Sequence, residues 1–401
     1  MFNRLYFILL ALLPIQLFAQ QDSPTETPIG GQTNDSRPIT TAVPFLAIAP
    51  DARSSGMGDV GAATSPDATA THWNPAKLAF AERDMAVSLS YSPWLQRIVG
   101  DMSLSYLTGY KKLSKTSAIA ASMRYFDLGS MQFTDANKQI IQDFNPREFA
   151  FDASYAMKLS KKFSMAVSGR YIYSNLSGNI TNSSTNTDTR AANSVAVDIS
   201  AFYTTDFMMG GLDSDLAFGA NISNMGPKIS YSSENQKDFI PTNLRLGTAL
   251  TSELDPYNKL TFALDFNKLL VPSPAEYDED GNLINGSDAS DTGWVTGMFQ
   301  SFGDAPGGAS EELQEFMIGT GLEYWYNDLV AARAGYYYES ENKGDRQYFT
   351  VGVGLRYQVF GIDFSYLITT AQNHPLQDTL RFTLFLNFND KATASNTGSV
   401  N

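Results

Sequence analysis

Between Met85 and Phe388 the sequence alternates repeatedly between apolar and polar residues, as in the run Phe349-Thr-Val-Gly-Val-Gly-Leu355. A period of two places alternate side chains on opposite faces of a β-sheet. The alternating segments have the length of about 9–11 residues that a tilted strand needs to cross a membrane. The pattern therefore predicts an all-β fold, a transmembrane antiparallel β-barrel of about 14 strands. The predicted strands begin near Met85, Met102, Ser117, Glu148, Phe163, Asn193, Asp215, Thr242, Lys259, Gln314, Leu329, Gln347, Gly361 and Thr379.

The connections between these strands alternate in length. Connections after the even strands are mostly short, and those after the odd strands are mostly long. The short ones cover residues 111–116, 160–162, 327–328 and 359–360, and the long ones cover residues 126–147, 176–192, 225–241 and 271–313. Bacterial outer-membrane barrels have short periplasmic turns and long extracellular loops. We therefore expect one barrel over residues 85–388 with both ends in the periplasm, and a soluble β-sandwich with one apolar face is the alternative.

Residues 44–84 differ from everything that follows them. They are dense in Gly, Ala, Ser and Thr and show neither an alternation nor a sustained helical stripe. Small residues let backbone approach backbone closely, and Pro66 and Pro75 each remove a hydrogen-bond donor. This composition predicts an N-terminal plug that fills the lumen from the periplasmic side, because residues 78–83 run directly into the first strand. A surface loop is the alternative interpretation.

The first residues carry an export signal. Residues 1–19 combine Arg4, a short apolar run at residues 5–13 and a small-residue end, which is the pattern of a secretory signal peptide. The apolar run is shorter than the roughly 20 residues that span a bilayer as a helix. Polar composition predicts a flexible leader at residues 20–43 and a flexible tail at residues 389–401.

Composition excludes several classes of site. The chain has no cysteine and only two histidines, so disulfides, thiolate metal sites and His-rich metal sites are not expected, and we predict no cofactor. A net charge of −14 argues against nucleic acid as a partner. Charged residues make up 17% of the chain, below the roughly 25% of soluble domains. An exported chain of this kind is predicted to lie in the outer membrane as a multi-pass β-barrel.

A hydrolase is an alternative interpretation, because His72 lies near Ser65 and Asp67 in the sequence and His374 lies near Asp378. The sequence contains no Gly-x-Ser-x-Gly motif, and triads are defined by geometry. We predict that the protein is not an enzyme.

Charges on the polar strand faces occur in pairs of opposite sign at equal distances from the predicted turns. In an antiparallel hairpin such residues face each other. The pairs are Asp152 with Arg170, Arg245 with Asp265, Glu323 with Arg333, and Arg356 with Asp363. We expect structural ion pairs that hold the wall and the plug, and a polar translocation path is the alternative.

The ninth loop carries the candidate partner-binding residues. Residues 269–332 contain no Lys or Arg and many acidic residues. Within them, an aromatic and Met cluster follows the spacing of a short amphipathic helix. The cluster consists of Trp294, Met298, Phe299 and Phe302, with Val295 beside them. We expect these side chains to cover the barrel mouth as a lid or to insert into a partner protein.

Three runs in order carry a resemblance: Pro44-Phe-Leu-Ala-Ile-Ala-Pro-Asp-Ala-Arg53, Gly56-Met-Gly-Asp59 and Trp73-Asn-Pro-Ala-Lys-Leu78. Together they resemble the start of the PorV (LptO) family, the outer-membrane shuttle proteins of the Bacteroidetes type IX secretion system. More distantly they resemble the FadL-like fatty-acid transporters, which carry an Asn-Pro-Ala-containing hatch before the first strand.

The resemblance implies a non-enzymatic adaptor that receives cargo at a translocon and carries it to a surface attachment complex. The implied partners are a translocon protein of the SprA or Sov type, an attachment-complex protein of the PorU type, cargo C-terminal signal domains, and outer-membrane lipid and lipopolysaccharide. No binding residue of the family can be transferred to a position of this chain. The alternative function is a FadL-like uptake channel for hydrophobic small molecules.

Overall fold

The structure is a computed structural model that describes residues 36–388 except 97–98, 135–139, 177, 179–180, 183–186, 233–236, 279–281, 287 and 372–373. The predicted signal peptide, most of the predicted leader and the predicted tail lie outside the described residues. The description below concerns the unit that begins at Arg37.

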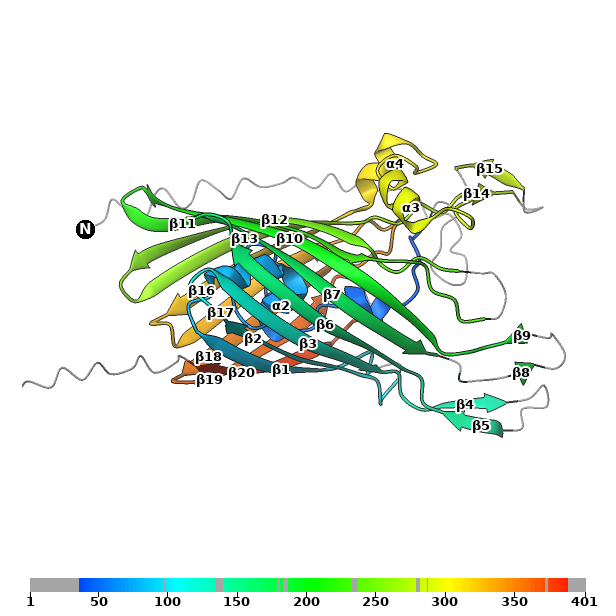
Figure 1. The fold of residues 1–401 in the computed structure, drawn as a ribbon, viewed down its shortest axis with the longest axis horizontal. Helices are drawn as coiled ribbons and strands as arrows, with labels where there is room; N and C mark the ends of the chain where they lie inside the picture. The colour runs from blue at the N-terminus through cyan, green and yellow to red at the C-terminus, as the bar shows by residue number, and fades with distance from the viewer. Residues whose placement is uncertain are drawn as a thin grey trace, which may run out of the picture. The chain divides into compact units, whose positions relative to one another are not determined.

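Fourteen strands hydrogen-bond in chain order into one closed antiparallel barrel, which confirms the predicted fold (Figure 1). The barrel strands are β1 (Met85–Pro93), β2 (Ser103–Lys112), β3 (Ser117–Asp127), β6 (Arg147–Lys158), β7 (Phe163–Asn175), β10 (Ala192–Met209), β11 (Leu212–Met225), β12 (Asn243–Asp255), β13 (Asn258–Leu269), β16 (Phe316–Tyr326), β17 (Val330–Tyr338), β18 (Tyr348–Tyr357), β19 (Phe360–Thr369) and β20 (Leu380–Phe388). Pairing of β1 with β20 closes the ring. Every predicted start lies within three residues of an observed one, the largest difference being Asp215 against Leu212.

The two faces of the wall follow the alternation of the sequence. At the closing seam, Leu89 faces Leu384 and the two side chains are 49% and 52% exposed. The next pair, Ser90 and Thr383, points inward, is fully buried and shares a hydrogen bond of 2.8 Å. Apolar residues outside and polar residues inside are the arrangement of a barrel in lipid. In the part of the chain that the structure describes, none of the helices has the length and apolarity to cross a bilayer.

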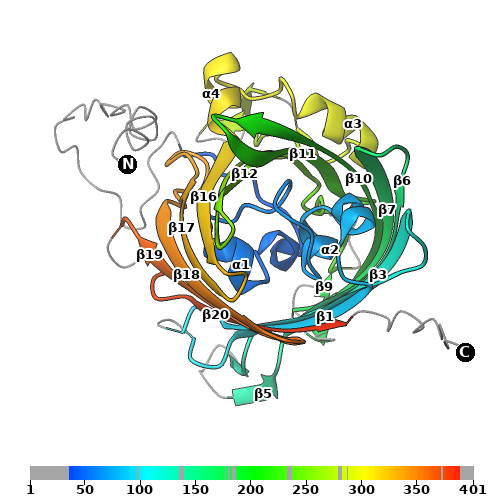
Figure 2. The same ribbon diagram turned by 90° about the vertical axis from the view of Figure 1, so that its left-hand side faces the viewer.

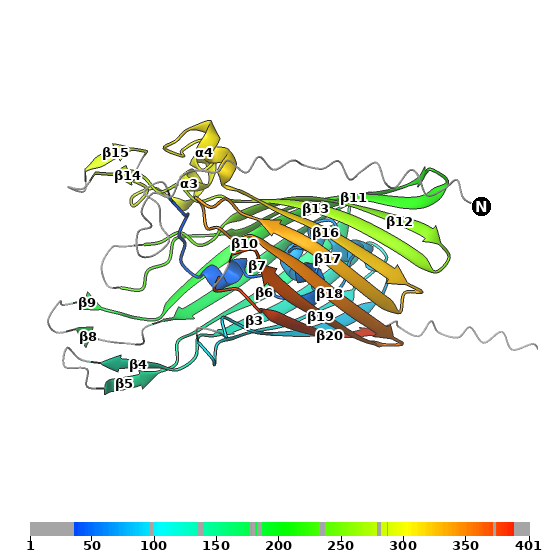
Figure 3. The same ribbon diagram turned by 180° about the vertical axis from the view of Figure 1, so that it is seen from behind.

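All the long connections lie at one end of the barrel and the short turns at the other, as predicted (Figures 1 and 3). The long connections carry small elements of their own: β4 (Met131–Thr134) with β5 (Ile140–Phe144), β8 (Thr181–Asn182) with β9 (Thr187–Asp188), β14 (Glu276–Tyr277) with β15 (Leu283–Asn285), α3 (Trp294–Gln300) and α4 (Ala309–Gln314). We call this end the outer end, because long loops are extracellular in outer-membrane barrels.

Residues 44–84, which we call the inner segment, lie inside the ring of strands (Figure 2). Their elements are η2 (Pro44–Ala47), α1 (Ala52–Ser55), α2 (Ala70–Trp73) and η3 (Pro75–Phe80). At the outer end, the Ala42 N–H donates to the carbonyl of Phe239 (2.9 Å). At the turn end, Lys112 Nζ donates to the carbonyl of Ala81 (2.8 Å). The segment therefore runs the length of the barrel and joins β1 at the turn end, where the sequence predicts the junction.

Two of the predicted charge pairs occur in the predicted register. Asp152 lies opposite Arg170, and Glu323 lies opposite Arg333. Both pairs form ion pairs, and the Arg333 Nε to Glu323 Oε2 distance is 2.7 Å. All four side chains are buried on the inner face of the wall.

The predicted pairing of Arg245 with Asp265 is wrong. The hairpin turns at Pro256–Tyr257, later than the midpoint at residue 255 that the predicted pairing requires, and a bulge between Glu253 and Asp255 offsets one residue of this difference. Arg245 therefore lies opposite Asn267, while Asp265 lies opposite Gly247. An alternating pattern reveals neither the exact turn residues nor a bulge, which inserts one extra residue on one strand.

The predicted register of Arg356 and Asp363 is also wrong, although the two side chains meet. The turn consists of Gln358 and Val359, one residue earlier than predicted, so that Arg356 lies opposite Gly361. Asp363 is two residues along the strand from Gly361, and a register shift of two residues keeps a side chain on the same face of the sheet. Arg356 Nη2 therefore still reaches Asp363 Oδ2 diagonally, at 2.6 Å.

Candidate functional site

On one side of the lumen the inner segment packs backbone against backbone. Gly58 has a left-handed φ of 72°, and a Cβ there would lie 2.6 Å from the carbonyl oxygens of Thr320 and Tyr336. From the wall, a Cβ on Gly335 would lie 2.1 Å from the Gly58 nitrogen, and one on Gly321 would lie 2.3 Å from the Met57 oxygen. Glycine is required on both sides of this contact because any side chain would separate the two backbones.

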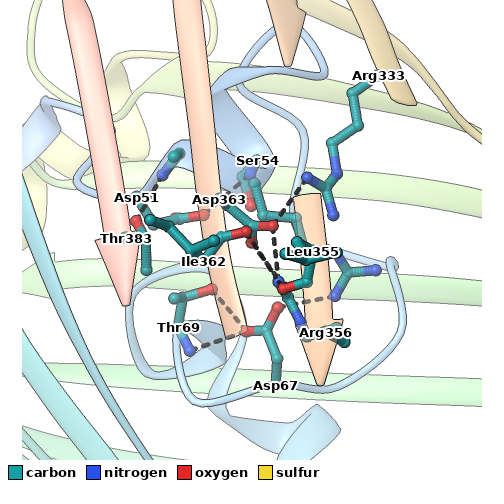
Figure 4. A network of polar contacts seen from close by, with 12 residues as sticks. Asp51, Ser54, Asp67, Thr69, Arg333, Leu355, Arg356, Ile362, Asp363 and Thr383 are labelled. Carbon is teal, nitrogen blue, oxygen red and sulfur yellow. Dashed lines mark hydrogen bonds and ion pairs between the residues drawn. The ribbon is translucent and has the colours of Figure 1, made fainter. Parts of the chain in front are cut away.

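A series of connected ion pairs between side chains holds the same region in place. Arg53 Nη2 contacts Glu323 Oε1 at 2.7 Å, and Glu323 also binds Arg333. Arg333 Nη1 also contacts Asp363 Oδ1 at 3.1 Å, and Asp363 in turn binds Arg356 (Figure 4). Each carboxylate accepts from two guanidinium groups, which satisfies the geometry that a buried ion pair requires.

Other contacts explain the motif residues of the inner segment. Asp51 caps α1 by accepting from the Ser54 N–H (2.9 Å), and its second oxygen accepts from Trp73 Nε1 (2.6 Å). Asp265 Oδ2 accepts from the backbone N–H groups of Gly61 (2.8 Å) and Ala62 (2.9 Å). Sequence reasoning missed this role of Asp265, because the acceptor and its donors are about two hundred residues apart.

The His72 environment is not that of a hydrolase. Its Nδ1 lies 2.6 Å from Arg124 Nη2, and arginine can only donate, so Nδ1 accepts and the proton is on Nε2. Ser65 and Asp67 instead bind Arg53. Burial and the adjacent Arg124 charge hold the pKa of His72 well below its usual value, so the ring is neutral.

The candidate partner-binding residues lie on and beside α3, at the outer end. Helix α3 packs through Gly297, where a Cβ would lie 2.7 Å from the Phe239 ring and 3.0 Å from Pro272. Trp294 and Met298 share this side and are half-buried. Phe299 is 68% exposed and Phe302 is 50% exposed.

The structure therefore divides the predicted cluster into two faces. Trp294, Met298 and Phe302 do not share one face, because α3 packs against the neighbouring loop through Gly297 and leaves Phe302 exposed. The exposed face consists of Val295, Phe299 and Phe302, and we call it the outer apolar face. Helices α3 and α4 lie beside the ring of strands instead of across its opening (Figures 1 and 2).

A cluster of ion pairs, which the sequence pattern did not predict, holds the base of this loop. Lys268 Nζ contacts Glu312 at 2.7 Å and Glu315 at 2.6 Å. On the other side, Glu311 binds Lys343 and Arg37, each at 2.7 Å. The acidic residues on α4 and at its C-cap are therefore neutralised by three cations from distant parts of the chain.

The Arg37 contact gives a pH-dependent prediction. Burial alone would raise the pKa of Glu311, but hydrogen bonds from Arg37 and Lys343 outweigh it and lower that pKa to about 2. A depressed carboxyl pKa contributes stability above the ordinary value of 4.5, and that contribution is lost as the pH falls toward 2. We expect Arg37→Gln to reduce this loss and to weaken the loop at neutral pH by about 1 kcal/mol.

Limited proteolysis of residues 270–315 at several pH values measures this effect. Lys162→Gln, which removes an exposed cation at the turn end, is the matched control and should behave like the unchanged protein. Equal pH dependence in all three proteins would show that Arg37 does not hold the loop.

These features define a class of protein: a closed membrane β-barrel whose lumen is occupied by its own N-terminal segment and whose outer end carries a braced helical loop. The family model described as type IX secretion system protein PorV matches residues 31–276. The chain belongs to the PorV family, and it is an outer-membrane β-barrel associated with type IX secretion. A search among curated proteins finds no match.

Solved structures with a similar barrel include two bacterial toluene transporters and a FadL homologue. The Ralstonia pickettii toluene transporter TbuX shares 14% identity, covering 84% of this chain and 98% of its own, with a TM-score of 0.49. The Pseudomonas putida toluene transporter TodX shares 13% identity, covering 85% of this chain and 98% of its own, with a TM-score of 0.47. A Pseudomonas aeruginosa FadL homologue shares 11% identity, covering 88% of this chain and 99% of its own, with a TM-score of 0.43.

Proposed function

We propose that the protein is a non-enzymatic adaptor of type IX secretion, which binds the translocon at the cell surface and carries cargo domains to the attachment complex. Membership of the PorV family is the basis for assigning the protein to type IX secretion. The observation that carries the adaptor role is the occupied lumen, because a lumen filled by the chain itself leaves no open path and favours a function through contacts of the outer surface. The inner segment seals the barrel in this proposal.

The sealing role is supported by the kind of contact that the inner segment makes. Gly58 lies against the wall backbone, and Arg53 joins the wall through the buried carboxylate of Glu323. Removing such a segment would expose buried charges and leave them unpaired, which costs several kcal/mol for each broken pair. A FadL-like uptake channel, the alternative function, requires this segment to move during transport.

The docking role is supported by the outer apolar face. Phe299 and Phe302 are large aromatic side chains held at the outer end by a braced loop. Aromatic residues dominate the energetic centres of protein interfaces. We propose that the outer apolar face docks on the translocon protein of the SprA or Sov type, while Trp294 and Met298 support it from the buried side of α3.

Replacing Val295, Phe299 and Phe302 by Ser tests this proposal. The three side chains are exposed, so the barrel should fold normally. A hot-spot loss of about 2 kcal/mol or more corresponds to a decrease of tenfold or more in affinity. We expect the translocon to disappear from the affinity-purified complex and cargo secretion to fall.

The matched control is Leu283→Ser with Ile284→Ser, which removes two exposed apolar residues of the same loop, on β15. This variant should leave both the co-purification of the translocon and the secretion of cargo unchanged. Normal association and secretion in the triple variant would contradict the docking role. A change confined to the uptake of hydrophobic solutes would support the channel alternative instead.

A further inference from the structure

A cavity of about 150 Å³ lies between the inner segment and the loops of the outer end. The inner segment contributes Ile48 and His72, the wall contributes Arg245 and Arg381, and Leu376 comes from the loop before β20. The lining thus combines apolar side chains with hydrogen-bond donors. The ionic chain through Glu323 does not include these donors.

Arg381 brings an uncompensated charge to this cavity. Its residue is 3% exposed, and its guanidinium lies 5.7 Å from the centre of the Trp94 ring. Within the described residues, Nε has no hydrogen-bond partner and the side chain forms no ion pair. A buried cation without a counter-charge is costly unless an anion or water meets it.

Arg245 adds a second guanidinium without an ion pair among the described residues. Its Nε donates to Asn267 Oδ1 at 2.8 Å, and its Nη1 lies 3.5 Å from the carbonyl oxygen of Trp73. Both acceptors are neutral, so its charge is not cancelled by a bonded carboxylate. This follows from the register of the β12–β13 hairpin, in which Arg245 lies opposite Asn267 and Asp265 lies opposite Gly247.

His72 supplies a third donor. Since its Nδ1 accepts from Arg124, its Nε2 carries the proton. That Nε2 is buried and has no hydrogen-bond partner in the described part of the chain. The side chain lines the same cavity as the two arginines.

The remaining charged groups of the lining have partners of their own. Arg346 is held by both oxygens of Glu339, at 2.6 and 2.8 Å. Asp59, the one carboxylate of the lining, accepts from the Tyr348 hydroxyl at 2.5 Å through Oδ2, and its Oδ1 has no partner. Positive charge and N–H donors therefore exceed carboxylate acceptors in the cavity.

We propose that this cavity binds a small oxyanion, a carboxylate or a phosphate, through Arg245, Arg381 and the Nε2–H of His72. The volume is below the roughly 300 Å³ of pockets for drug-sized ligands, so the bound group is a free small ion or the head of an amphiphile. Because the ligand would bridge the inner segment and the wall, it would stabilise the folded barrel. The proposal is independent of the role in secretion.

Thermal unfolding of the purified full-length barrel in a maltoside detergent tests the proposal. Sodium phosphate, acetate and octanoate are titrated against sodium chloride at equal ionic strength. We expect a saturable rise in melting temperature with an oxyanion and none with chloride. A response to phosphate or acetate identifies a free ion, and a response to octanoate alone identifies the head of an amphiphile.

Arg381→Gln should abolish the rise, whereas Arg147→Gln, which removes an exposed arginine of the outward face, should keep it. A rise that persists in the double variant Arg245→Gln with Arg381→Gln would overturn the proposal, as would an equal rise with chloride. Equilibrium dialysis of the unchanged protein with radiolabelled phosphate, acetate and octanoate gives a test without variants. Retention of none of the three would overturn the proposal whether or not the variants fold.

Discussion

Replacing Glu323 by Gln is expected to lower the free energy of unfolding of the barrel by about 3–5 kcal/mol. Glu323 is 1% exposed and accepts from Arg53 and Arg333, each at 2.7 Å. Glutamine has nearly the same shape but no charge, so it leaves two buried guanidinium groups with one negative charge fewer. The change should appear in urea unfolding of the purified protein and as loss of heat resistance on gels.

Glu253→Gln is the matched control for this prediction. Glu253 is on β12, its side chain is 53% exposed, and its nearest ion-pair partner, Lys259, lies 3.6 Å away. An exposed pair of this kind contributes at most about 1 kcal/mol. If Glu323→Gln is no less stable than Glu253→Gln, the buried ions do not hold the inner segment.

Replacing Gly58 by Ala is expected to displace the inner segment from the wall. The new Cβ would lie 2.6 Å from two wall carbonyl oxygens, and such overpacking costs about 1–3 kcal/mol. The left-handed φ of 72° adds about 1–2 kcal/mol for a residue with a Cβ. We expect the strands to form while the inner segment becomes sensitive to protease, which mass spectrometry of the cleaved protein detects.

Gly169→Ala serves as the control for the glycine prediction. Gly169 is in β7, and a Cβ there meets no atom within 4 Å. It should leave the protease pattern unchanged. If Gly58→Ala gives the same pattern as Gly169→Ala, the close backbone contact does not fix the segment.

The number of strands, their approximate starts and their two faces were determined by the sequence alone. A period of two is a local property, so each strand reveals its faces without knowledge of its neighbours. Leu89 and Ser90 are on the sides that their polarity predicts. The lengths of the connections are local too, and they indicated correctly which end carries the loops. The helix near Trp294 also followed from local spacing.

The pairing of distant residues was decided only by the tertiary structure. The position of the β12–β13 turn and the bulge beside it place Asn267 opposite Arg245, and Asp265 accepts instead from the backbone of the inner segment. An alternating pattern contains no signal for the exact turn or for one extra residue. The exposed side of α3 was set by the fit of Gly297 against Phe239, which is far away in the sequence. Arg37 reaches Glu311 across 274 positions. These contacts depend on how the closed barrel brings distant segments together, and no local pattern records that.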